Sequence, residues 1–197
     1  MFMMNRIKGS LKNGSGKLRI IGLVILLAVF SELFVYSLLY IIFNFFPSLG
    51  SMYTDNISGL LEKRLVTFIS VTVVSPLMEE LIFRGLILKL FHRFLNFAIA
   101  NVLQALLFGI YHMNLVQGLY AFLLGILIGC IFYLTRNILY CVLFHFVLNT
   151  CGVILGYLYI DFGIIVISIL MVVTLGLGMY TFMTMRRLCL MHKVYKV

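Results

Sequence analysis

Six side chains capable of acid, base or hydrogen-bonding chemistry interrupt three strongly apolar segments of the chain. They are two carboxylates, a guanidinium, two imidazoles and an amide: Glu79, Glu80, Arg84, His112, His145 and Asn149. An ionisable group in a membrane-spanning helix costs about 2.5–3.5 kcal/mol on insertion scales, so such groups pair with one another or face a wet cavity. Their clustering predicts one shared polar site that can activate water.

The spacing of the charged residues gives the two carboxylates different roles. Neighbouring residues diverge by about 100° around a helix, so Glu79 and Glu80 point in different directions. Glu80 precedes Arg84 by one turn, and this spacing predicts an ion pair between them. Glu79 is then left free to act as a general base.

The remaining polar residues lie on two further apolar segments. His145 and Asn149 are one helical turn apart, so both can donate to one oxygen atom, as an oxyanion requires. Glu79 and His112 lie about equally far from the loop at residues 94–96, which predicts the same depth and a shared water nucleophile. His145 lies nearer to its own loop, so tilt or an irregular segment is needed to unite all three.

The composition identifies the elements that position these residues. Of 197 residues, 63% are hydrophobic and 11% charged, and the mean hydropathy of +1.16 is far above that of a soluble domain. We expect an all-α, polytopic integral membrane helix bundle, with a basic arm (1–19), a helical domain (20–185) and a basic tail (186–197). A span needs about 20 apolar residues, and about six segments qualify: 20–46, 65–88, 97–114, 117–134, 138–158 and 162–183.

The charges predict how the chain sits in a cell membrane. The 15 Lys and Arg outnumber the 6 Asp and Glu, which in so apolar a chain indicates basic cytoplasmic loops and no nucleic-acid partner. If each segment crosses once, one side receives the basic residues of both termini and the loops: Lys89, Arg93, Arg136, Arg186, Arg187, Lys193 and Lys196. The other side receives Asp55, Glu62, Lys63, Arg64 and Asp161. Both termini are therefore expected in the cytoplasm.

Three short motifs carry a resemblance to a known family. The stretches M-E-E-L-I-F-R-G, F-G-I-Y-H and H-F-V-L-N resemble the E-E-x-x-x-R, F-x-x-x-H and H-x-x-x-N motifs of the CPBP intramembrane proteases, which include CAAX prenyl endopeptidases and bacterial Abi and bacteriocin-processing proteins. The resemblance implies that Glu79 and His112 activate water and that His145 and Asn149 stabilise the transition state. Glu80 and Arg84 are implied as supporting neighbours.

The cofactor stays open between metal-free chemistry, which we favour, and a divalent metal such as zinc. The family has been described in both ways. The chain has no H-E-x-x-H motif, so zinc would require Glu79, His112 and His145 to converge around an open position.

The expected function is hydrolysis of a peptide bond in or near the bilayer. The expected partners are a peptide or small membrane-associated precursor and the lipid bilayer itself. A non-catalytic immunity or scaffold protein is the main alternative, and an ion-coupled transporter is a weaker one because the inverted repeats of many transporters are missing. Glu32 lies within the first apolar segment and belongs to none of the motifs. The Gly pairs 125/129 and 152/156 are expected to pack helices closely.

Overall fold

The computed structural model describes residues 15–58, 64–158 and 163–194, and every element in these ranges is helical. The expected all-α fold is thus confirmed. The sequence of elements is α2 (Ser15–Phe45), α3 (Pro47–Ser58), α4 (Arg64–Ile69), the π-helix η1 (Ser70–Val74), α5 (Ser75–Glu80), the π-helix η2 (Leu81–Ile87), α6 (Leu88–Phe94), α7 (Phe97–Tyr111), α8 (Leu115–Thr135), α9 (Ile138–Leu158) and α10 (Gly163–Val194). Much of the basic arm, together with Glu62, Lys63, Asp161 and Lys196, lies outside the described residues.

Five helices of the described chain are long and apolar enough to cross a membrane. They span Gly16–Phe45, Leu65–Phe94, Leu115–Thr135, Ile138–Leu158 and Gly163–Met191. The segment expected at 97–114 forms only the 15 residues of α7. At about 1.5 Å per residue, α7 is roughly 22 Å long, shorter than the ~30 Å hydrocarbon core.

Polar caps explain why α7 is short. Asn96 precedes the helix and accepts a hydrogen bond from the amide of Ile99. Beyond its last turn, Met113 adopts a left-handed conformation with φ of 55°, and Asn114 caps α8 by accepting from the amide of Gln117. Side-chain acceptors at these positions replace missing intrahelical partners and so fix where each helix begins.

Two other boundaries differ from the expected spans. The structure adds α3, a helix that the apolar pattern did not predict because it is largely polar. Its first residue is Pro47, and proline is favoured in the first turn of a helix. The last helix, α10, continues past residue 185 to Val194, so the expected start of the basic tail lies within a helix.

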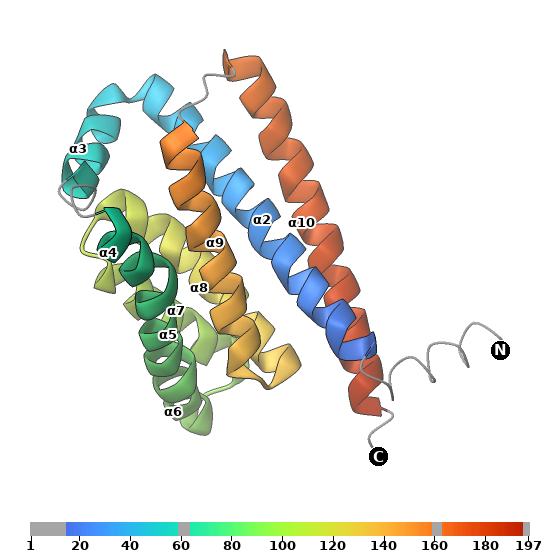
Figure 1. Ribbon diagram of the computed structural model, residues 1–197. Coiled ribbons are helices and arrows are strands. Elements are labelled where there is room, and N and C mark those ends of the chain that lie inside the picture. The colour runs from blue at the N-terminus through green and yellow to red at the C-terminus, as the bar shows by residue number, and fades with distance from the viewer. Residues whose placement is uncertain (1–14, 59–63, 159–162, 195–197) are drawn as a thin grey trace.

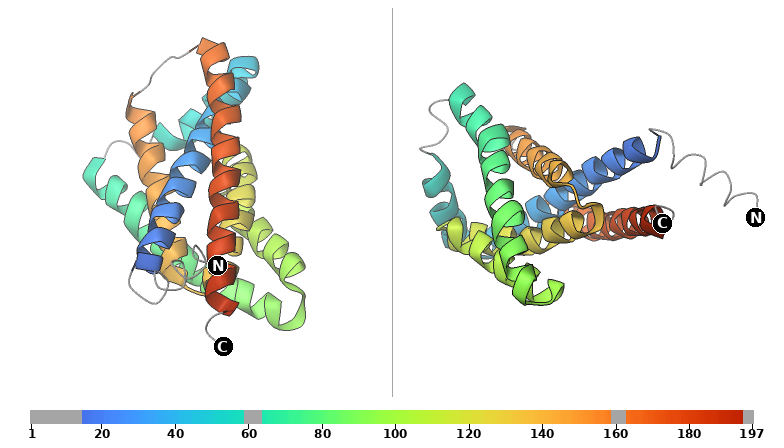
Figure 2. Two further views of the ribbon diagram at one scale, coloured as in Figure 1. Left: turned by 90° about the vertical axis from the view of Figure 1, so that its right-hand side faces the viewer. Right: turned by 90° about the horizontal axis from the view of Figure 1, so that it is seen from below.

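The helices form two packed groups that share α9. The long helices α2 and α10 run side by side, and α2 also packs along α9 (Figure 1). The antiparallel helices α7 and α8 form the other close pair. Seen from below, α4 to α6 cross the bundle on the side away from α10 (Figure 2).

Small residues allow the close approach of α7 to α8. A Cβ atom on Gly109 would lie 2.6 Å from the carbonyl oxygen of Gly118, and one on Gly125 would lie 3.1 Å from the Cβ of Ala105. Gly129 likewise faces Asn101. The packing expected of Gly125 and Gly129 is therefore observed.

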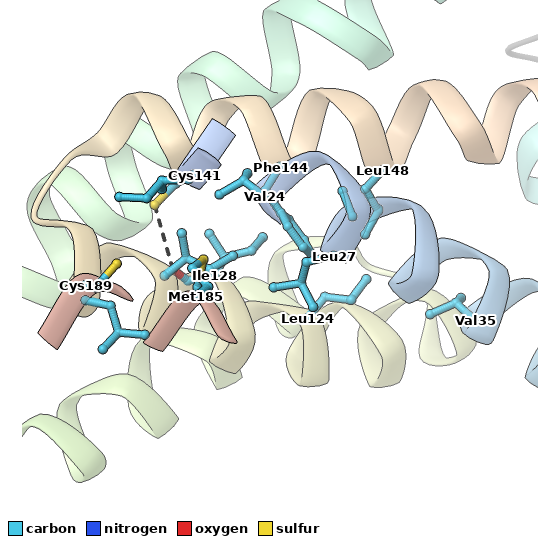
Figure 3. Close-up of a cluster of buried hydrophobic side chains, with 14 residues drawn as sticks. Val24, Leu27, Val35, Leu124, Ile128, Cys141, Phe144, Leu148, Met185 and Cys189 are labelled. Carbon is cyan, nitrogen blue, oxygen red and sulfur yellow. Dashed lines mark hydrogen bonds between the residues drawn. The ribbon is translucent and has the colours of Figure 1, made fainter. Parts of the chain in front are cut away.

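The main apolar core lies between α2, α8, α9 and α10 (Figure 3). Val24 and Leu27 of α2 meet Ile128 of α8 and Phe144 of α9, and all four side chains are at most 2% exposed. The thiol of Cys141 lies in the same core and donates to the carbonyl of Ile128 at 3.7 Å. This core holds α9 in place, and α9 carries two of the candidate site residues.

Candidate active site

An unbroken chain of charged hydrogen bonds joins three side chains within the bundle. Nη1 of Arg84 donates to Oε1 of Glu80 at 2.8 Å, which confirms the ion pair expected from their spacing. Nδ1 of His145 donates to the same oxygen, also at 2.8 Å. Because Arg84 and Glu80 are fully buried, the pair is shielded from water, and such shielding strengthens electrostatic interactions.

The support for this ion pair comes from α7 and α8. Nη2 of Arg84 donates to the carbonyl of Gly125 at 3.1 Å, and Nε2 of Gln104 donates to the same carbonyl at 3.0 Å. The guanidinium also lies 4.6 Å from the ring centroid of Phe108. Gln104 and Gly125 are thus supporting residues that no motif identified, although a Gln inside an apolar segment was a visible signal.

Among the ion pairs of the described residues, Glu79 takes part in one, with His145. Its Oε2 atom lies 3.7 Å from Nε2 of His145. This distance exceeds that of a direct hydrogen bond. The Glu79 side chain is 13% exposed and that of His145 is 6% exposed, so the gap between them lies near the edge of the buried network.

The imidazole of His145 therefore lies between two carboxylates. Its Nδ1 atom is committed to Glu80, which fixes the orientation of the ring and directs Nε2 towards Glu79. A carboxylate that anchors one ring nitrogen in this way leaves the other nitrogen to act on a bound molecule. The sequence did not predict this contact, because it joins residues on different helices.

His112 lies next to this group without an ion pair to Glu79 in the part of the chain that the structure describes. Its Nδ1 atom donates to the carbonyl of Phe108 at 2.8 Å. The Phe108 ring contacts both imidazoles, with centroid distances of 4.8 Å to His112 and 5.8 Å to His145. The shared water expected between Glu79 and His112 stays a prediction.

Asn149 is held on the same face of α9 as His145. Its Nδ2 atom donates to the carbonyl of Val71 at 2.9 Å, and Val71 belongs to η1. One of the two amide protons of Asn149 is therefore used in an interhelical contact. The second proton is available to a bound group.

Two π-helical segments flank the short helix that carries both glutamates. The five residues of η1 precede α5, and the seven residues of η2 follow it. π-helical turns are rare and frequent at functional sites. The sequence predicted that tilt or an irregular segment is needed to bring Glu79 and His145 together, and these π-helices are irregular segments of that kind. The pattern of apolar residues does not indicate where they begin.

Glu32 belongs to α2, and its carboxylate lies against α9 at Gly152, about one turn beyond Asn149. The Cβ of an alanine at position 152 would lie 2.8 Å from its Oε1 atom, so the carboxylate rests on Gly152. Tyr53 and Tyr120 lie nearby, and their hydroxyl groups are 3.2 Å apart. Glu32 therefore contacts the helix of the site, while the hydrogen bonds and ion pairs described for the four candidate catalytic residues do not include it.

The candidate zinc ligands do not converge in this arrangement. Within the described ranges, no group of three or more His, Cys, Asp or Glu side chains is placed to hold a metal ion. Of the three candidate ligands, Glu79 and His145 lie 3.7 Å apart, while Nδ1 of His112 is bound to the carbonyl of Phe108. The residues as placed do not fit the zinc site that the sequence left open.

The fold and this polar group together define a multi-pass membrane protein with a partly buried carboxylate–imidazole site. Residues 61–151, slightly less than half of the chain, match the family described as "Type II CAAX prenyl endopeptidase Rce1-like". The matched segment contains all six candidate site residues and confirms the resemblance to the CAAX protease family. It supports a membrane endopeptidase. No curated protein and no solved structure matches the chain.

Proposed function

We propose that the protein is an intramembrane endopeptidase in which Glu79 is the general base for an attacking water. The observation that carries this proposal is the 3.7 Å separation of Glu79 Oε2 from His145 Nε2. A water oxygen can lie about 2.8 Å from each of these two atoms, so both groups can form a hydrogen bond to the same water. A carboxylate and an imidazole that share one water are a recurrent unit for hydrolysis.

The proposed reaction uses the groups as follows. Glu79 takes a proton from water, and the hydroxide oxygen bonds to the carbonyl carbon of the scissile amide. The resulting oxyanion receives hydrogen bonds from Nε2 of protonated His145 and from the second amide proton of Asn149. The C–N bond then breaks as Glu79 returns its proton to the amine, leaving a carboxylic acid and an amine.

The supporting residues keep the imidazole in this role. Because Glu80 accepts the Nδ1 proton of His145, it holds the ring with Nε2 directed towards the bound molecule. Arg84 in turn fixes Glu80. His112 is proposed, from the family resemblance, as a second group for the water, since its Nδ1 is committed to Phe108 and its Nε2 is left to act.

The proposed substrate is a peptide or small precursor associated with the membrane. Apolar helices surround the polar group, and a site of this kind excludes bulk water and strengthens contacts to the reacting carbonyl. Both termini are proposed to lie in the cytoplasm, as the basic loops favour. No nucleic acid is involved in this proposal.

The test is a cleavage assay with the full-length protein in liposomes. A panel of membrane-associated precursors, prenylated and unprenylated, is incubated with wild-type protein and with Glu79→Gln, and products are identified by mass spectrometry. We expect products from the wild type only. Precursors that bind both proteins without cleavage would support the non-catalytic scaffold function instead, and equal cleavage by both would contradict the role of Glu79.

A further inference from the structure

A cavity lies at the end of the bundle where α6 meets the α8–α9 turn, and none of the six candidate site residues lines it. Its volume is about 790 Å³, which lies within the usual range of ligand sites. We call it the interfacial pocket, and its polar part is formed by Lys89, His92, Arg136 and Asn137. Its apolar part is formed by Leu81, Leu86, Leu88, Phe97, Phe132 and Ile138.

The charge of the interfacial pocket is positive. No Asp or Glu lines it, and neither Lys89 nor Arg136 forms an ion pair with any residue that the structure describes. Their partners are aromatic faces: Nζ of Lys89 lies 5.7 Å from the ring centroid of Phe132, and Cζ of Arg136 lies 4.7 Å from that of Tyr133. Both cations are therefore held at the pocket with their charge available to an anion.

Local backbone and ring contacts build this arrangement. Arg136 ends α8 in a left-handed conformation with φ of 54°, a strained position for a residue with a side chain. Tyr133 stacks on Phe97 with ring centroids 4.0 Å apart, and His92 packs edge-on to the same two rings. The aromatic group fixes one wall of the pocket.

The position of the interfacial pocket indicates what occupies it. The α6 end and the α8–α9 turn lie at the same end of the bundle as the start of α2 and the last turns of α10 (Figures 1 and 2). Helix ends of a membrane bundle lie at the level of lipid headgroups. The apolar wall is also open to the lipid side, because Leu81 is 47% and Leu86 is 63% exposed.

We propose that the interfacial pocket binds an anionic phospholipid, with the headgroup phosphate at Lys89 and Arg136 and an acyl chain along Leu81 and Leu86. Basic pockets between helices at a membrane surface bind such headgroups. The mixed lining fits a molecule that is anionic at one end and apolar at the other. This site is separate from Glu79 and does not depend on the proposed hydrolysis.

The experiment measures lipid binding to the full-length protein in neutral detergent by native mass spectrometry. The probes are phosphatidylglycerol and phosphatidylcholine with the same acyl chains. One basic side chain near a headgroup contributes about fivefold in affinity, so two contribute on the order of 30-fold. We expect phosphatidylglycerol to bind about that much more tightly than phosphatidylcholine, and the Lys89→Gln, Arg136→Gln double variant to lose this preference.

Matched variants distinguish lipid binding in this pocket from general electrostatic attraction between the basic protein surface and an anionic lipid. Lys17→Gln, Arg93→Gln removes the same charge at the same end of the bundle without altering a lining residue, and it should retain the preference. The charge-preserving pair Lys89→Arg, Arg136→Lys should retain most of it. Equal losses in the two Gln pairs would overturn the proposal.

A competition arm distinguishes the lipid from a soluble anion. Inorganic phosphate is added to the wild-type protein bound to phosphatidylglycerol. We expect the lipid to stay bound, because the acyl chain contributes to its affinity. Displacement by inorganic phosphate, or equal binding of the two lipids, would overturn the proposal even if the variants failed to fold.

Discussion

Nδ1 of His145 donates a hydrogen bond to Oε1 of Glu80 at 2.8 Å, across two helices and between residues 65 positions apart in the chain. The same oxygen accepts from Arg84. The spacing along the helix pairs Glu80 with Arg84 alone. In the structure Glu80 also orients the imidazole of His145, which faces Glu79. The charged pair thus links the stability of the bundle to the geometry of the site.

Removing the guanidinium should destabilise the protein strongly. Arg84→Met leaves Glu80 buried without its cation, and loss of one partner from a buried pair costs about 3–5 kcal/mol. The free energy of unfolding, measured by SDS titration in mixed micelles, should fall by that amount. Arg93→Met is the control, because Arg93 is exposed and surface changes cost about 0.5 kcal/mol or less. Equal effects of the two variants would contradict the account.

Asn149 should matter more for turnover than for stability. Asn149→Ala removes the hydrogen bond to Val71, and interhelical hydrogen bonds in membranes contribute about 0.6 kcal/mol, at most about 1.7. Loss of an oxyanion donor lowers kcat by about 10²–10³-fold. We expect that fall in cleavage with a small loss of stability. A stability loss without a loss of kcat would show that Asn149 has a packing role only.

Adding one methyl group where α7 crosses α8 should destabilise the protein. Gly109→Ala places a Cβ against the Gly118 carbonyl, which is backbone and cannot turn aside. Overpacking of this kind costs about 1–3 kcal/mol, measurable by the same SDS titration.

Gly176→Ala is the matched control for this substitution. No atom lies within 4 Å of a Cβ at that position, and alanine is a better helix former than glycine by about 1 kcal/mol. Its stability should be unchanged or higher. A destabilisation equal to that of Gly109→Ala would show that loss of glycine itself, and not the helix crossing, is responsible.

Cleavage should survive metal removal. The three side chains that a zinc site would need, Glu79, His112 and His145, form no such cluster within the described residues. The measurement is metal analysis of the purified protein combined with cleavage in the presence of a strong zinc chelator. Activity lost on chelation and restored by Zn²⁺ would refute this expectation.

Most of what the sequence predicted depends on residues that are close together in the chain. Apolar length located the long helices, and helical spacing paired Glu80 with Arg84, because both depend only on the chain close by. The short α7 depends instead on caps at Asn96 and Asn114, which apolar length ignores. Counting residues from the loop at 94–96 assumes regular helices, and the π-helix η2 lies between Glu79 and that loop.

Contacts between helices were the part that could not be predicted. The π-helical segments η1 and η2 alter the direction of successive side chains around Glu79, and nothing in an apolar run marks where such a segment begins. The partner of Glu79 is therefore His145 in the structure. Helix crossings such as that at Gly109 and Gly118 decide these contacts, and they depend on the packed bundle as a whole.

The most direct measurement is single-turnover cleavage of a membrane-associated precursor by wild-type protein, Glu79→Gln and Glu32→Gln in liposomes. Both variants replace a carboxylate in a spanning segment by its amide, but only Glu79 faces His145. General-base catalysis contributes about 10²–10⁴-fold, so we predict a loss of that size in Glu79→Gln and the wild-type rate in Glu32→Gln. Wild-type turnover by Glu79→Gln, in protein that inserts and folds normally, would contradict the account.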